Sequence, residues 1–303
     1  MKILITGGNG FIGSHLVKAF LEAGHIVHVI SRNTIITDKP KTGLICFTGE
    51  YDDGNLLGKA FKDVDVVFHL AYTTVPENST LNPVMDVETN VIPSLNLLRI
   101  CSENKIKKIF FISSGGVVYG NKSVFPIKET DKTNPLSSYG ISKWMIENQI
   151  KLLSKKLNLD YCIFRVSNAY GSGQHSRKNQ GVINIWMEKI MSNEPIQIMG
   201  DGSVVRDYIH IDDIVSAVRK SLETNLCGVY NLGTGIGTSL NEIVILLEKT
   251  CGKKAVIQYS EGRRFDVEKN ILDCSELKKT VGWEPKVKLP EGIKNIFIEK
   301  FEK

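Results

Sequence analysis

The sequence has no long apolar run, and none of its apolar stretches approaches the roughly 20 residues that a membrane-spanning helix needs. Residues 1–5 are apolar apart from Lys2, but Thr6-Gly7-Gly8 ends this stretch. Such a stretch is too short for the apolar region of a signal peptide. We therefore expect no association with a membrane, and we expect a cytoplasmic location.

Cysteines at metal-ligand or paired spacing are also lacking. The six cysteines form no Cys-x-x-Cys pair and do not lie at zinc-ligand spacing from a histidine. They fit free thiols in a reducing compartment, and we expect no metal site. The net charge of +5 is mild, and Lys and Arg are scattered among Asp and Glu. A nucleic-acid partner would need a basic stripe and is not expected, whereas an acidic substrate such as a diphosphate suits this charge.

The first half of the chain has a regular alternation of apolar and amphipathic segments. With 303 residues, 42% of them hydrophobic, the chain can bury a sizeable core. Strands that alternate with helices predict an α/β fold with a doubly wound parallel Rossmann sheet covered on both faces. We assign this dinucleotide-binding fold to residues 1–167. The strands are expected at 2–6, 26–30, 64–70, 108–113 and 161–166, and the two long helices at 84–104 and 139–157.

The pattern becomes looser in the second half. We expect residues 168–303 to form mainly a smaller, mixed α/β lobe that binds the substrate at the carboxyl edge of the sheet. Short apolar segments at 196–199 and 256–259 alternate there with helices. Some segments near 205–235 are expected to return to the main domain, where a strand around 229–232 could join the sheet.

The turn from Gly7 to Gly13 lies between the first predicted strand and the first predicted helix. It fits both Gly-x-Gly-x-x-Gly and Gly-x-x-Gly-x-x-Gly. Glycine permits the tight turn and the close approach of a pyrophosphate, and the free N–H groups at the helix start face that anion. In a strand–turn–helix at this place, the pattern predicts that the chain binds a dinucleotide.

The residues after the second strand bear on the choice between NAD and NADP. An acidic residue there usually accepts a hydrogen bond from the 2′-hydroxyl of NAD, but this chain has Ile30-Ser31-Arg32-Asn33. Ser31 and Arg32 suit a 2′-phosphate by hydrogen bond and charge, which favours NADP over NAD. Arg32 could equally stack on the adenine or point to solvent. Glu50, after the next apolar run, could accept from the adenine amino group.

Tyr139 and Lys143 are four residues apart in a predicted helix, so they share one face. A lysine ammonium near a tyrosine favours the phenolate and is expected to lower the tyrosine pKa from about 10. Such a tyrosine can exchange a proton with a substrate hydroxyl or carbonyl while hydride moves to or from a nicotinamide. Lys143 could also hold the nicotinamide ribose.

Together these motifs closely resemble the extended short-chain dehydrogenases/reductases. Within them, the chain is most similar to the nucleotide-sugar epimerases and dehydratases, typified by UDP-galactose 4-epimerase. The resemblance runs from residue 2 to about residue 289. It is carried by the glycine turn and by His69-Leu70-Ala71, Ser113-Ser114-Gly115-Gly116-Val117-Val118-Tyr119-Gly120, Tyr139-x-x-x-Lys143 and Arg206-Asp207-Tyr208-Ile209-His210-Ile211-Asp212-Asp213.

The resemblance implies roles for particular residues. Tyr139 matches the general acid/base, and Lys143 matches its partner. Cofactor contacts are implied, together with Ser31, Arg32, Tyr139 and Lys143, for Gly7, Gly10, Phe11, Ile12, Gly13, Glu50, Tyr51, Leu70, Ala71, Tyr72, Asn90 and Ser113. Contacts with the substrate, a nucleotide-diphosphate sugar, are implied for Gly115, Asn168, Val182, Arg206, Arg263 and Asp266. A local salt bridge is the alternative explanation for Arg206-Asp207.

Two departures from the family pattern matter. The family usually has a serine or threonine four residues before the motif tyrosine, here Tyr119, and this chain has Gly115. The neighbouring hydroxyl of Ser114 could substitute for it, a water could fill the gap, or Tyr139 could act alone. Val117 also replaces a position that is often threonine. The second departure is the Ser31-Arg32 pair, where NAD-using epimerases generally carry an acidic residue.

Three functions stay open at this point. The first is a nucleotide-sugar 4-epimerase, in which hydride leaves the sugar for the cofactor and returns to the other face. The second is an NADP(H)-dependent reductase of a 4-keto nucleotide sugar. The third is a catalytically inactive, cofactor-binding family member. A 4,6-dehydratase is disfavoured because Gly115-Gly116 offers no acid. A homodimer is expected from pairing of the helices at 84–104 and 139–157, whose apolar positions could equally be internal.

Overall fold

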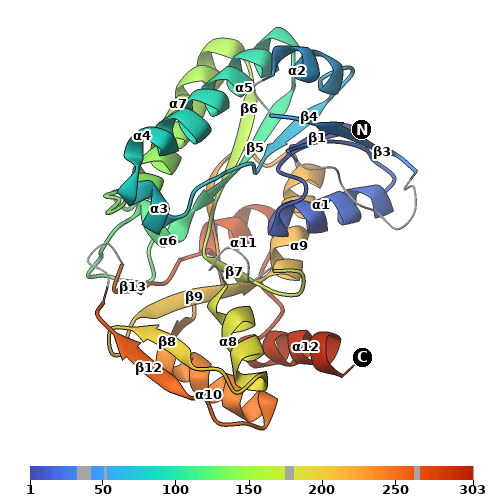
Figure 1. Cartoon of the computed structure of the whole chain (residues 1–303). Coiled ribbons are helices and arrows are strands. Elements are labelled where there is room, and N and C mark those ends of the chain that lie inside the picture. The colour runs from blue at the N-terminus through green and yellow to red at the C-terminus, as the bar shows by residue number, and fades with distance from the viewer. Residues whose placement is uncertain (33–41, 51–52, 175–180, 263–266, 303) are drawn as a thin grey trace.

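The computed structural model describes residues 1–32, 42–50, 53–174, 181–262 and 267–302. It has two parts, an upper one built on a large sheet and a smaller lower one that contains the C-terminus (Figure 1). Within these ranges, no helix has both the length and the apolar character needed to cross a membrane.

The main sheet has seven strands, and every neighbouring pair is parallel. The predicted doubly wound α/β fold is therefore confirmed. The chain order reverses between β1 and β4, and ligands of such sheets bind at that point, outside the carboxyl ends of the strands. In sheet order the strands are β10 (Gly228–Leu232), β6 (Asp160–Val166), β5 (Lys108–Ser114), β4 (Val66–His69), β1 (Lys2–Thr6), β2 (Ile26–Ser31) and β3 (Leu44–Thr48).

Helices cover both faces of this sheet, which explains why its central strands are apolar on both sides. Along β1, Ile3 and Ile5 face one core, whereas Leu4 faces the other. The first core is completed by α1 (Phe11–Glu22), α9 (Ile211–Glu223) and α11 (Ser275–Val281). The second core is completed by α2 (Gly54–Ala60), α5 (Ile92–Glu103) and α7 (Ser138–Leu157).

The predicted helix at 84–104 is interrupted. Its first part is α4 (Pro83–Asp86), followed by a π-helical turn, η1 (Val87–Val91), and then by α5. Pro93 has no N–H to donate to the preceding turn, which disfavours a regular α-helix here. Such π-turns often occur at functional sites. The short helix α3 (Pro76–Leu81) precedes this segment.

The lower part is mixed, with a third apolar core. Its central strand, β9 (Val205–His210), pairs in parallel with β7 (Asn168–Tyr170) and β13 (Lys269–Asn270) and antiparallel with β11 (Gly237–Ser239). A separate parallel pair consists of β8 (Ile196–Met199) and β12 (Ile257–Ser260). The helices of this part are α8 (Val182–Met191), α10 (Leu240–Cys251) and α12 (Leu289–Phe301).

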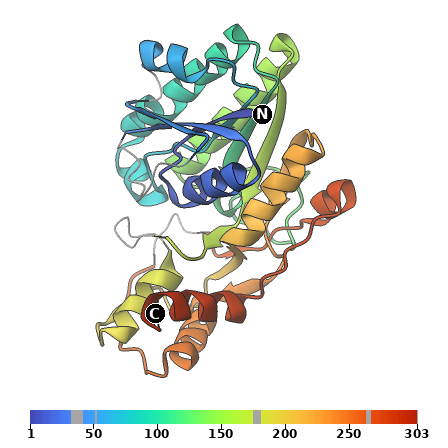
Figure 2. The same ribbon diagram turned by 90° about the vertical axis from the view of Figure 1, so that its right-hand side faces the viewer.

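The two parts share elements. Figure 2 shows α9 rising from the lower part toward the main sheet, while α12 stays below. Ile214 and Val218 of α9 pack in the first core of the main sheet, and β10 lies beside β6 at its edge. Within the segment 205–235, β9, which precedes α9 and β10, belongs to the lower sheet instead. The domain boundary near residue 167 stays a prediction.

Candidate active site

The glycine turn leads from β1 into α1 and is shaped by backbone contacts. A Cβ atom on Gly13 would lie 2.3 Å from the carbonyl oxygen of Gly7, and one on Gly7 would lie 2.8 Å from the amide nitrogen of Ala71. The turn therefore packs tightly against both α1 and the end of β4. The N-terminus of α1 has no side-chain cap and no acidic residue in its first turn. Its first N–H groups are thus suited to an anion.

The residues predicted to select the cofactor lie at the carboxyl ends of β2 and β3. The hydroxyl of Ser31 accepts a hydrogen bond of 2.9 Å from the side-chain amide of Asn9. The amide of Gly49 donates to the carbonyl of Ser31 at 3.0 Å, which brings the exposed Glu50 near the exposed Arg32. Tyr51, the other predicted adenine contact, lies outside the described residues.

A buried chain of hydrogen bonds supports the end of β4, where Leu70, Ala71 and Tyr72 follow. The hydroxyl of Thr6 is 2.8 Å from Nδ1 of His69, and it accepts from the amide of Ala71 at 3.3 Å. Nε2 of His69 is 2.8 Å from the hydroxyl of Ser94 in α5. Burial lowers the pKa of His69 to about 3, so this imidazole is neutral. It acts as a rigid link between β1, β4 and α5.

Asn90, predicted to lie near the cofactor, is fully buried in η1. Its side-chain oxygen accepts from the amide of Thr73 at 2.8 Å, and its amide group donates to the carboxylate of Asp86 at 3.1 Å. Asp86 is also fully buried, and it accepts a hydrogen bond from the hydroxyl of Thr74. The π-turn thereby holds the loop that follows Tyr72.

Tyr139 and Lys143 lie on the face of α7 that packs on the main sheet. Nζ of Lys143 donates to the carbonyl of Ile112 in β5 at 2.8 Å, and it lies 3.9 Å from the ring centroid of Tyr72. The rings of Tyr72 and Tyr139 meet edge to face at 4.9 Å, and Nζ of Lys143 is 5.8 Å from the Tyr139 ring. Three predicted residues, one after the end of β4 and two on α7, thus form one cluster.

The expected lowering of the Tyr139 pKa is wrong for the protein alone. Burial raises the pKa of this phenol above its usual value, and the negative charge of Asp86 raises it further. Burial also lowers the pKa of Lys143 to about 7, although Glu147 and Asp86 oppose this shift. Desolvation therefore outweighs the attraction between the two groups, and Lys143 is only partly cationic near neutral pH.

A second group of predicted residues lies where β5 ends. A Cβ atom on Gly116 would lie 3.7 Å from the hydroxyl oxygen of Ser114 and 3.5 Å from the side-chain oxygen of Asn168. Both polar groups therefore border the space over this glycine. Gly115 has no such space, because its Cβ would lie 2.5 Å from Cδ1 of Leu272. The carbonyl of Gly115 accepts a hydrogen bond of 2.8 Å from Asn270.

Two further predicted substrate residues are in the lower part. Val182 begins α8, and Arg206 is half-buried in β9, where its Nη1 donates to the carbonyl of Val205 at 3.0 Å. Asp207 is fully buried and accepts hydrogen bonds from the amides of the 234–235 turn at 2.9 and 3.0 Å. Arg263 and Asp266 lie outside the described residues. In the part of the chain that the structure describes, no three His, Cys, Asp or Glu side chains form a metal-binding group.

Three buried polar residues of the site region were missed from the sequence. Asp86 lies four residues before Asn90, and Glu147 lies four residues after Lys143. This helical spacing was a usable signal for both. Asn270 had none, because its contact with Gly115 joins segments 155 residues apart.

A glycine turn at the first strand of a doubly wound sheet, with a tyrosine–lysine cluster at the same edge, defines a Rossmann-type dinucleotide-binding enzyme. The family model described as the NAD dependent epimerase/dehydratase family matches residues 3–233. The chain belongs to this family of enzymes, as its motifs predicted.

Known relatives are similar over nearly the whole chain. The dTDP-4-dehydro-6-deoxyglucose reductase of Escherichia coli is 35% identical over 304 residues, covering 96% of this chain and 95% of that protein. The structure of Thermotoga maritima UDP-glucose 4-epimerase with UDP-glucose has a TM-score of 0.93 and 36% identity, covering 100% and 99% of the two chains. The UDP-glucose 4-epimerase of Thermus thermophilus in complex with NAD has a TM-score of 0.91 and 31% identity, covering 98% and 97%.

Proposed function

We propose that the chain is a nucleotide-sugar 4-epimerase. The observation that carries this proposal is the cluster of Tyr139, Lys143 and Tyr72, which lies at the carboxyl edge of the sheet near the end of β5. Ser114 and Asn168 border a space at that end of β5 and supply a hydroxyl and an amide for a sugar diphosphate. The similarity to an epimerase structure that contains UDP-glucose supports the substrate class.

The cofactor we propose is NAD. The glycine turn and the uncapped start of α1 fit a pyrophosphate. We assign Lys143 to the nicotinamide ribose. The family description and the relative that contains NAD favour NAD over NADP. Ser31 and Arg32 argue for NADP, but the hydroxyl of Ser31 accepts a hydrogen bond from Asn9. When bound, this cofactor supplies the acceptor and donor of hydride for the sugar C4 position.

The protein's own part in the reaction is to move one proton and to orient the sugar. We assign the proton of the 4-hydroxyl to the phenol oxygen of Tyr139, with the hydroxyl of Ser114 sharing it. Gly115 cannot be replaced by the usual serine without displacing Leu272, so Ser114 is the hydroxyl that this loop offers. The nucleotide diphosphate is proposed to bind to Asn168, Val182, Arg206, Arg263 and Asp266.

An NADP(H)-dependent 4-keto nucleotide-sugar reductase is the second candidate. The 35% identity to the E. coli reductase and the exposed position of Arg32 favour it. In that reaction Tyr139 would donate its proton to the carbonyl oxygen. A catalytically inactive protein is disfavoured because the tyrosine–lysine cluster is intact.

Cofactor identity separates these candidates. We expect that purified protein, once denatured, releases NAD(H), and that the native protein interconverts a UDP-, dTDP-, GDP- or CDP-sugar with its 4-epimer without net redox change. Mass spectrometry of the released nucleotide and chromatography of the sugars measure both. Protein that carries no nucleotide and consumes NADPH with a 4-keto sugar would establish the reductase instead. Absence of both activities would leave the cofactor-binding protein.

A homodimer is also proposed, through α5 and α7. These helices bury one face in the second core, yet apolar side chains on their other faces are exposed, including Ile92, Ile141, Trp144 and Leu152. We expect Trp144→Glu to halve the mass measured by sedimentation equilibrium, because a charge would be buried in the interface. Ile245→Glu, at an exposed apolar position of α10, is the control and should leave the mass unchanged. A native protein that sediments as a monomer would refute the proposal.

A further inference from the structure

The face of α7 that carries Lys143 is fixed to β5 at two successive residues. Nζ of Lys143 donates to the carbonyl of Ile112 at 2.8 Å, and one turn later the carboxylate of Glu147 accepts from the hydroxyl of Ser113 at 2.5 Å. Ser114 comes next in β5. The position of Glu147 therefore determines how α7, with Tyr139 and Lys143, lies against the strand that carries Ser114.

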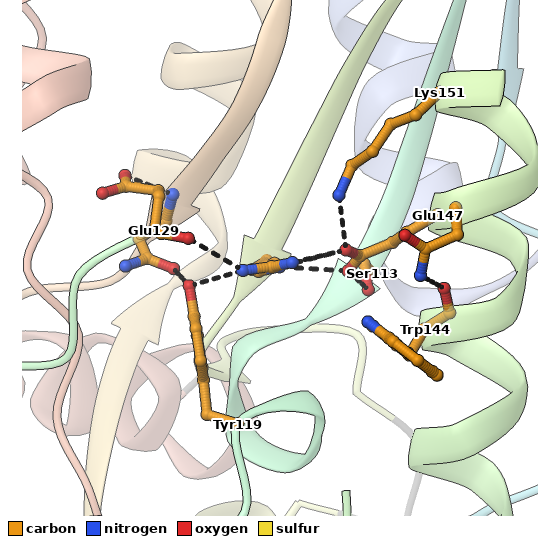
Figure 3. A network of polar contacts seen from close by, with 9 residues as sticks. Ser113, Tyr119, Glu129, Trp144, Glu147 and Lys151 are labelled. Atoms are coloured by element: carbon orange, nitrogen blue, oxygen red, sulfur yellow. Dashed lines mark hydrogen bonds and ion pairs between the residues drawn. The ribbon is translucent and has the colours of Figure 1, made fainter. Parts of the chain in front are cut away.

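Glu147 is itself held by a buried ion pair. Its side chain is fully buried, and Arg165 in β6 is 4% exposed. Nε of Arg165 donates to both carboxylate oxygens at 3.2 and 3.1 Å, and Nη2 donates to one of them at 2.7 Å. Figure 3 shows Glu147 facing Ser113, with the half-buried Lys151 on its other side at 3.8 Å. The two-point contact with Arg165 fixes the direction of the carboxylate.

The network continues to the loop that follows the site. Nη1 of Arg165 donates to the hydroxyl of Tyr119 at 3.0 Å, and that hydroxyl donates to the side-chain oxygen of Asn231 in β10 at 2.6 Å. The backbone amide of Asn231 donates to the carboxylate of Glu129 at 2.8 Å. Arg165 is thus shared between Glu147 of α7 and the motif tyrosine, Tyr119.

Stability alone does not account for this arrangement, because a buried ion pair is often no more stabilising than apolar residues of the same size. A role in the site does account for it. Two carboxylates, those of Glu147 and Asp86, oppose the lowering of the Lys143 pKa by burial. Glu147 is the one on the same helix as Lys143, one turn away. The titratable groups that surround Lys143 are Tyr139 and Glu147 of α7, Asp86 of α4, and His69 and Tyr72 at the end of β4.

We propose that Glu147, held by Arg165, is a positioning residue that sets how Lys143 and Tyr139 of α7 lie against the strand that carries Ser114, and that its charge supports the ammonium form of Lys143. This inference rests on the proposed role of Tyr139 and Lys143 in proton transfer. The buried pair of Glu147 and Arg165 then acts on the reaction through Lys143 and through the hydroxyl of Ser113. We assign neither residue of this pair a contact with the substrate.

The first test is a lysine titration that needs no turnover. In cofactor-free protein labelled with ¹³C-lysine, NMR should report a Lys143 pKa about one unit lower in Glu147→Gln than in the native protein, a tenfold loss of proton affinity. Glutamine keeps an acceptor for Ser113 but removes the charge. Lys151→Met, which removes the half-buried neighbour of Glu147, is the control and should leave the Lys143 pKa unchanged.

The second test separates charge from position. In active protein, the alkaline limb of the kcat profile should move to lower pH in Glu147→Gln, so that kcat falls about tenfold at pH 8 and little at pH 5.5. Glu147→Asp keeps the charge but shortens the side chain by one methylene. The alkaline limb should therefore stay at the same pH, while kcat falls at every pH. KM for the sugar nucleotide should change little in either variant.

A further variant keeps the test valid if Glu147→Gln fails to fold. The double substitution Glu147→Gln with Arg165→Met removes both charges, so no buried cation is left unpaired. It should fold, and the Lys143 pKa should again fall, by less than in Glu147→Gln, because loss of the Arg165 cation favours the protonated lysine. Unchanged Lys143 pKa and pH profile in folded variants would overturn the inference. Native protein that has no activity, or that is unaffected by Tyr139→Phe, would instead refute the proposed function.

Discussion

Replacing Tyr139 by phenylalanine is expected to lower kcat by about 10²- to 10⁴-fold, the usual contribution of a general acid/base. The substitution removes one hydroxyl and keeps the ring that packs against Tyr72 at 4.9 Å. The Kd for the dinucleotide should therefore stay within about threefold of the native value. A tenfold change would need a loss of about 1.4 kcal/mol of binding free energy. Steady-state kinetics on the identified sugar nucleotide and a fluorescence titration with the dinucleotide measure the two effects.

Ser114→Ala is the companion variant. Its hydroxyl only shares the proton in our proposal, so we expect a smaller loss of kcat, about 10- to 100-fold, with KM for the sugar little changed. A Tyr139→Phe protein within threefold of the native kcat would show that the proton moves through another group. A Ser114→Ala protein with native kcat would show that Tyr139 acts without a hydroxyl partner on this loop.

A methyl group at Gly13 is expected to abolish tight binding of the dinucleotide. The Cβ atom of Gly13→Ala would lie 2.3 Å from the carbonyl oxygen of Gly7 and 2.9 Å from Cα of Gly8, and both are backbone atoms that cannot rotate away. The start of α1 must then move off the turn. Overpacking of this kind destabilises proteins by about 1–3 kcal/mol. We expect at least a tenfold loss of affinity in calorimetry and a lower Tm.

Gly58→Ala provides the matched control. Gly58 lies in the short helix α2, and its added Cβ would have no atom within 4 Å. Alanine should stabilise the helix by about 0.5–1 kcal/mol and leave dinucleotide affinity unchanged. If Gly13→Ala bound the dinucleotide as tightly as Gly58→Ala does, the close packing of the turn would not be what shapes the cofactor site.

Hydrophobic periodicity was sufficient to predict most of the fold. The strand expected at 161–166 is β6, and the helix expected at 139–157 is α7, each with one additional residue. Pro93 was a local signal of a break in this helix, but the form of the break, a π-turn, depends on the buried contacts of Asn90 and Asp86, which local pattern does not show.

The site was predictable where it depends on strand ends. The carboxyl ends of parallel strands lie at one edge of the sheet, so the clustering of Tyr72 with Tyr139 and Lys143 follows from the topology. The raised pKa of Tyr139 was not predictable, because it depends on how completely the folded protein removes water from the phenol. Nor was the reason for Gly115, which is the packing of Leu272 from the far end of the chain.

The contact between residues 270–273 and the loop after β5 has a mechanical consequence. Ile127 donates its amide to the carbonyl of Ile271 at 2.8 Å and accepts from the amide of Asp273 at 2.7 Å, while Asn270 holds the carbonyl of Gly115. The loop that begins at Ser114 is therefore hinged to the lower part of the molecule as well as to the sheet. Any closure of the lower part on a bound sugar would pull directly on the segment beside Ser114, so domain movement and alignment of that hydroxyl would be a single event.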